Sequence, residues 1–172
     1  MSPLDTALLP RDGAWTMNNL YDADILEWSE RQAALLRRRS AGELVNEAEL
    51  DWTNIAEEIE SVGRSELHAV ESHLVQALLH DLKAEAWPLS RDVPHWRAAA
   101  RGHRGDARRA FAPSMRQKID VADLYRDALR RLPETMDDQA PMPLPTECPV
   151  TLDQLLAELP DVYHAGSGRY SR

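Results

Sequence analysis

The stretch from Asp51 to Ala86 constrains the fold more than any other part of this chain, because it predicts one very long helix. It contains no proline and a single glycine, Gly63, and most of its residues lose little rotamer freedom in a helix. Asp51 is suited to cap its N-terminus, and Pro88 lies just past its end. Because so long a helix is uncommon in globular proteins, we expect Gly63 either to bend it or to admit a close neighbour. The positions expected to face the core are Ile55, Ile59, Val62, Val70, Leu74, Leu78 and Leu82.

Three further long helices and one short helix are predicted around it. The first begins at Asp22 or Asp24 and ends at Ser40, followed by Gly42 as a stop. Another opens at Val93-Pro94 and ends before Pro113, since proline suits the first helical position but not the interior. The next runs over residues 121–132 with Asp120 as its cap.

The C-terminal part contains a proline-rich segment over residues 133–149, which we interpret as an extended strap. Thr151 and Gln154 then form a capping box that starts a short last helix. No alternating strand pattern occurs, so we predict an all-α protein, a compact bundle of four main helices plus the short C-terminal helix. We assign residues 1–20 to an N-terminal arm, 21–160 to a single helical domain and 161–172 to a flexible tail.

Charge and cysteine content narrow the classes of function. The net charge of −9 argues against general nucleic-acid binding, and the single Cys148 fits a reducing compartment. No apolar run is long enough for a signal peptide or a membrane span, so a cytoplasmic protein is expected.

Several motifs follow one another in the order found in a bacterial protein family. They are YDADILEW at residues 21–28, LDWTNIAEEIESVGRSE at 50–66, LLHDLK at 78–83, Trp96, and ECPVTLDQLL at 147–156. Over residues 21–160 the chain therefore resembles the family known only as domain of unknown function number 29. The resemblance implies a helical bundle and brings no established reaction. The chain departs from the family's pattern at Asp81, where leucine is usual, and at Val150, where an aromatic residue is usual.

Most family-signature residues are interpreted as structural. Trp52 and Trp96 are expected to be core anchors, and Cys148 a small buried apolar group. Glu57, Glu58 and Glu60 lie near a helix N-terminus, where the dipole favours carboxylates, so we interpret them as a solvated face. The complete set of signature residues is Asp51, Trp52, Asn54, Glu57, Glu58, Gly63, Glu66, His80, Lys83, Trp96, Cys148 and Pro149.

A candidate metal site follows from Glu66, His73 and His80, which recur every seven residues and share one helix face. Imidazole and carboxylate suit zinc, iron or nickel. Seven residues rise about 10.5 Å along a helix, so the two histidines are poorly spaced for one ion, and carboxylates from another helix would be needed. The alternative that we favour is that Glu66 and His80 make buried hydrogen bonds or an ion pair.

A candidate binding surface follows from the uneven charge. Residues 87–131 carry 11 basic and 5 acidic side chains, and Arg97, Arg101, Arg104 and Arg108 form one stripe of a helix. Such a row can contact phosphates or an acidic protein, but pairing with the acidic long helix is favoured, because no aromatic residues alternate with the arginines. Arg97 and His103 also have the spacing of helical toxin-type ribonucleases, although Ala98 replaces the usual polar residue.

Without a catalytic constellation, the sequence favours a non-enzymatic cytoplasmic interaction or regulatory module with a protein partner. The first alternative is a metal-dependent helical-bundle enzyme that uses the Glu/His stripe, with a divalent metal as its cofactor. The second is an RNA-binding or ribonuclease-like protein, which the net charge disfavours. No membrane partner is expected, and a homo-oligomer is left open.

Overall fold

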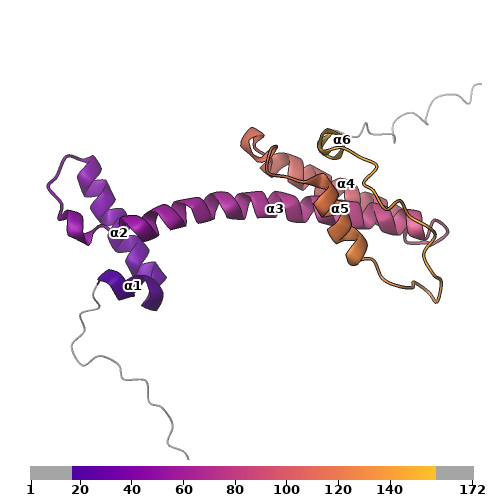
Figure 1. Ribbon diagram of the computed structural model, residues 1–172, viewed down its shortest axis with the longest axis horizontal. Coiled ribbons are helices and arrows are strands. Elements are labelled where there is room, and N and C mark those ends of the chain that lie inside the picture. Colours follow the sequence, from indigo (N-terminus) through magenta and orange to yellow (C-terminus); the bar gives the residue numbers. More distant parts are fainter. Residues whose placement is uncertain (1–16, 158–172) are drawn as a thin grey trace, which may run out of the picture. The chain divides into compact units, whose positions relative to one another are not determined.

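The computed structural model describes residues 17–157, with side chains from Leu20 onward (Figure 1). Within this part of the chain every regular element is a helix, apart from an isolated bridge between Met136 and Gln139. The all-α prediction is therefore confirmed. The α-helices are α1 (Met17–Ala23), α2 (Ile25–Ser40), α3 (Trp52–Ala86), α4 (Val93–Ala110), α5 (Val121–Arg130) and α6 (Leu152–Leu156), with short 3-10 turns at Glu47–Glu49 and Pro113–Met115. None of these helices is long and apolar enough to cross a membrane.

The internal contacts of the chain form two compact units, one up to Val62 and one from Gly63 onward. We call them the N-terminal unit and the C-terminal unit, and α3 contributes to both. The assignment of residues 21–160 to one domain stays a prediction. The predicted tail, residues 161–172, lies outside the described residues.

Helix α3 runs without a break through Gly63, and a Cβ built on that glycine would meet no atom within 4 Å. The expectation that Gly63 admits a close neighbour is therefore wrong, and the expectation of a bend stays a prediction. Its conformation is ordinary helix, for which glycine is a poor choice because it loses the most backbone freedom on folding.

Replacing Gly63 with alanine is expected to raise the free energy of unfolding by about 1 kcal/mol, since the methyl group has open space and alanine has the higher helix propensity. Gly42 is the matched control, because its φ of +81° lies in the left-handed region that penalises alanine. Gly42→Ala should therefore destabilise. Urea denaturation of both variants checks the pair, and a loss of stability in Gly63→Ala would show that its surroundings are not open.

The N-terminal unit is organised around the carboxylate of Asp51. Its Oδ1 accepts from the backbone N–H of Asn54 at 3.3 Å, as the N-cap prediction requires, and its Oδ2 accepts from Asn54 Nδ2 at 2.7 Å. The same Oδ2 accepts from the indole Nε1 of Trp28 at 3.2 Å. Gln32, only 2% exposed, receives the backbone N–H of Asp51 at 3.0 Å and donates to the carbonyl of Glu49 at 3.1 Å. The signature residues Asp51 and Asn54 are thus joined with Trp28 and Gln32 in one hydrogen-bonded network.

Three expectations for the N-terminal unit are wrong. Residues 17–20, assigned to the arm, belong to α1, because Leu20 is fully buried and tertiary packing can stabilise a helix too short to be seen as a periodic pattern. Trp52 is not a core anchor: it is 47% exposed, with the guanidinium of Arg39 5.7 Å from its ring centroid. Ile59 and Val62 are also exposed, at 69% and 64%, whereas Ile55 is buried.

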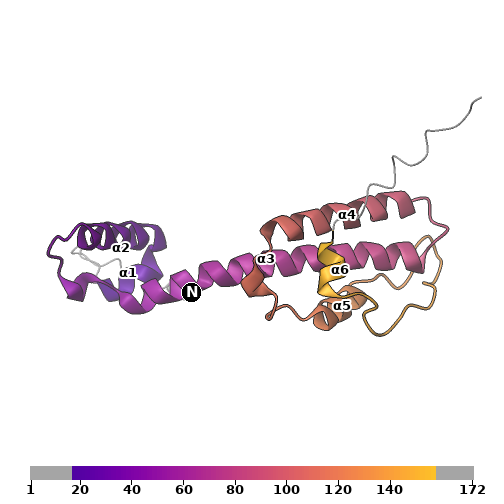
Figure 2. The same ribbon diagram turned by 90° about the horizontal axis from the view of Figure 1, so that it is seen from above.

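In the C-terminal unit, α4 and α5 flank the second half of α3, and α6 lies across it (Figure 2). Val70 and Leu74 of α3, Tyr125 of α5 and Leu155 of α6 belong to one buried cluster. Trp96 is 6% exposed, as predicted for a core anchor.

Hydrogen bonds hold the predicted strap against α5 and the residue that follows α3. The indole Nε1 of Trp87 donates to the carbonyl of Gln139 at 3.0 Å, and the Tyr125 hydroxyl donates to the carbonyl of Pro145 at 2.8 Å. At its end, Thr151 and Gln154 form the reciprocal capping box that starts α6.

Candidate metal centre

Three potential metal ligands converge between α3 and α4 in the C-terminal unit. His103 and Asp106 are one turn apart on α4 and so share a side of that helix. Ala100 and Ala107 are buried, so the face of α4 that carries them is directed toward the core. His103 lies between them in sequence and contacts His73 of α3. The three side chains are half-buried, and their ligand atoms all lie within 4.8 Å of one another.

The two imidazoles are spaced as ligands of a single ion. Their Nδ1 atoms are 3.4 Å apart. Two nitrogens bonded at about 2.0–2.1 Å to a tetrahedral ion would stand about 3.4 Å from each other, so this separation fits zinc geometry. The carboxylate of Asp106 pairs with Arg109 on the surface, a contact between neighbouring turns that contributes little stability and leaves oxygen lone pairs for an ion.

His80 is the third imidazole in this row, and it contacts His103 through the face of its ring and not through a nitrogen atom. Its ring stacks on that of His103 with centroids 5.7 Å apart and planes 11° from parallel. Its Nδ1 is buried without a hydrogen-bond partner among the described residues. Burial, and then the neighbouring charges of Lys83, His103 and His95, lower the pKa of His80 below the ordinary 6.5. His80 is thus a neutral neighbour of the site.

This pKa shift predicts a loss of stability in acid. Between pH 6.5 and the lower pKa of the folded state, the unfolded chain binds more protons at His80, so the free energy of unfolding should fall as the pH drops below about 6.5. His80→Phe keeps an aromatic ring and removes the titration, so urea denaturation at pH 7.5 and 5.5 should show a smaller pH effect in this variant. An unchanged pH effect would contradict the assignment to His80.

The predicted trio of Glu66, His73 and His80 is not assembled as such. Glu66 is exposed, so it does not make the buried hydrogen bond or ion pair that we favoured. The structure joins His73 instead to His103 and Asp106, which the sequence reasoning missed. The His-x-x-Asp spacing of residues 103 and 106 was the available signal, and the carboxylate does come from another helix, as the argument required.

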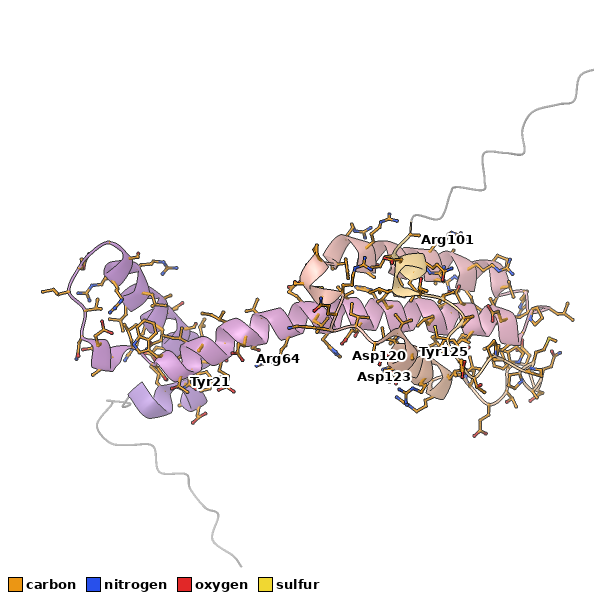
Figure 3. All side chains as sticks on the ribbon, turned by 45° about the horizontal axis from the view of Figure 1, so that its top comes forward. Tyr21, Arg64, Arg101, Asp120, Asp123 and Tyr125 are labelled. Carbon is orange, nitrogen blue, oxygen red and sulfur yellow. The ribbon has the colours of Figure 1, made fainter. Side chains whose placement is uncertain are left out.

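The four arginines of the predicted stripe differ in burial. Arg104 is half-buried and forms an ion pair with Asp81 of α3, which is the internal pairing that we favoured. Arg97, Arg101 and Arg108 are exposed, and Arg101 lies on the outer side of α4 (Figure 3).

The remaining signature groups have structural surroundings. The carboxylate of Glu58 accepts a hydrogen bond from the Tyr21 hydroxyl at 2.5 Å, which raises the pKa of Tyr21 to about 12. Glu57 and Glu60 are exposed, as expected for a solvated face. Cys148 is half-buried, with its thiol 3.3 Å from the carbonyl of Val150.

A pocket of about 200 Å³ lies in the C-terminal unit, beside the ion pair of Asp81 and Arg104. Both departures from the family pattern, Asp81 and Val150, line it. An aromatic side chain at position 150 would occupy part of this volume. The complete lining is Leu78, Asp81, Leu82, Glu85, Arg104, Tyr125, Pro149 and Val150.

Fold and site together define an all-helical protein with a histidine-rich seam between two helices. The chain belongs to the family described as "Domain of unknown function DUF29", whose model matches residues 20–159. It is also similar to an α-helical protein of unknown function from Rhodospirillum rubrum ATCC 11170, known from a crystal structure, with 27% sequence identity and a TM-score of 0.55. That match covers 80% of this chain and 89% of the other. The search of curated proteins gave no match.

Proposed function

We propose that the C-terminal unit binds one divalent transition-metal ion through His73, His103 and Asp106, and that the protein works in the cytoplasm as a metal-dependent helical protein. The observation that carries the proposal is the 3.4 Å separation of the two Nδ1 atoms, with a carboxylate within reach of both. Three protein ligands leave a fourth position for water or substrate, a composition typical of catalytic rather than structural zinc sites.

Zinc titration of the chelator-treated, untagged full chain tests this proposal. We expect one zinc ion per chain in the wild type, and much weaker binding in His73→Ala and Asp106→Asn. His68→Ala is the matched control, because its side chain is on the same helix as His73 but 82% exposed. Equal loss in the control, or no stoichiometric binding by the wild type, would refute the proposal.

A second candidate function, a protein-interaction surface, is supported by the exposure of Arg97 and Arg101 on one stripe of α4. Reversing both to glutamate should abolish capture of a partner from a lysate of the native host, because charges on an interface rim determine encounter and specificity. Arg104 is unsuitable for this test, since it is tied to Asp81. Reversal of Arg126 and Arg130, exposed on α5, provides the control, and capture that survives the α4 reversal would exclude this surface.

A further inference from the structure

The pocket in the C-terminal unit combines apolar walls with an unusual arrangement of charge. Leu78 and Leu82 of α3 and Val150 of the chain that follows the strap supply apolar walls. Asp81 and Glu85 lie one turn apart on α3, an arrangement of like charges that destabilises a helix. Such a pair is unfavourable for the free protein and becomes favourable when a cation lies between the carboxylates.

The pocket has an excess of negative charge. Arg104 compensates Asp81 through their ion pair, but Glu85 makes no ion pair with a described residue. Burial first, and also the charge of Glu85, raise the pKa of Asp81, while Arg104 and Arg97 act in the opposite direction. A ligand with one positively charged group would neutralise the excess negative charge of the pocket.

The pocket also has a hydrogen-bond donor without an acceptor. The Nε of Arg104 is buried and has no partner among the described residues, and the side chain is 17% exposed. This Nε is itself closed to solvent, so a ligand carboxylate would pair instead with the charge of the Arg104 guanidinium, which lines the pocket.

The volume of the pocket, about 200 Å³, suits a small molecule such as a free amino acid.

We propose that this pocket binds a free α-amino acid with an apolar side chain. The ammonium group lies between Asp81 and Glu85, and the carboxylate pairs with the guanidinium of Arg104. The apolar side chain packs against Leu78, Leu82 and Val150. This activity is independent of the metal centre, because none of the three proposed metal ligands lines the pocket.

Isothermal titration calorimetry of the full chain tests the proposal with L-leucine, L-valine and L-methionine as probes. We expect saturable 1:1 binding of at least one of them, unchanged by a chelator. The matched ligands for L-leucine are 3-methylbutylamine, which lacks the carboxylate, and 4-methylpentanoate, which lacks the ammonium group. Each should bind at least about tenfold weaker, since each leaves one charged group of the pocket unpaired. Failure of all three amino acids, or equal binding of either analogue, would overturn the proposal.

Two substitutions connect the binding to the pocket. Glu85→Gln should weaken amino-acid binding at least about tenfold, and Val150→Phe should block it by filling the volume. Glu66→Gln is the control, because Glu66 is an exposed carboxylate of the same helix outside the pocket. Glu85 is itself exposed, so its variant is expected to fold, which circular dichroism verifies. Wild-type affinity in Glu85→Gln would refute the assignment even if Val150→Phe failed to fold.

Discussion

Replacing His103 with alanine is expected to lower the zinc affinity of the chain at least about 100-fold, the largest effect of any single change at the proposed centre. Loss of supporting groups around a metal already costs about 10–100-fold, and His103 is proposed as a direct ligand. Its imidazole also contacts the rings of both His73 and His80. The variant should therefore also lose the rise in melting temperature that zinc gives the wild type, because zinc stabilises the folded state only when it is bound to it.

A second substitution separates ligation from packing. His103→Phe keeps an aromatic ring to stack on His80 but has no nitrogen for a metal, so it should lose zinc binding as fully as His103→Ala while unfolding closer to the metal-free wild type. Competition titration against a chromophoric chelator measures the affinity, and thermal unfolding with and without zinc measures the linkage. Zinc-dependent stabilisation that persists in His103→Phe would place the ion elsewhere.

Replacing Asp51 with alanine is expected to lower the free energy of unfolding by about 3 kcal/mol. The substitution removes the side-chain cap of α3, worth about 1 kcal/mol. It also leaves the indole N–H of buried Trp28 without its acceptor, which costs a further 1–3 kcal/mol or so. The effect should fall on the N-terminal unit, to which both residues belong.

Asp51→Asn is the matched control, because the amide oxygen can still cap the helix or accept from Trp28. It should cost clearly less than Asp51→Ala in urea denaturation followed by the fluorescence of the tryptophans. Equal losses would show that the charge of Asp51, rather than its hydrogen bonds, stabilises the N-terminal unit.

The helices of this protein were predictable where local chemistry determines them. Asp24, Asp120 and Thr151 all cap helices as their residue types predict, and α3 spans Trp52–Ala86 after its Asp51 cap, as its composition indicates. Helix α1 was missed because it is stabilised by the burial of Leu20 rather than by its own pattern.

Burial along α3 was predicted less well, since periodicity shows which residues share a face but not whether another element covers that face. Ile59 and Val62 continue the apolar pattern of Ile55, yet they are exposed. The same limit applies to the candidate site. Glu66 and His73 share a face of α3, but only His73 lies where α4 supplies His103 and Asp106. A pairing between two helices depends on their tertiary arrangement, which no spacing within one helix encodes.

The most direct test of the metal centre is an anomalous difference map at the zinc absorption edge from crystals of the full chain grown with zinc. We expect one strong peak about 2.0–2.2 Å from the Nδ1 atoms of His73 and His103 and from a carboxylate oxygen of Asp106. A peak only at the exposed His68 or His95, or no peak between α3 and α4 at stoichiometric zinc, would contradict it.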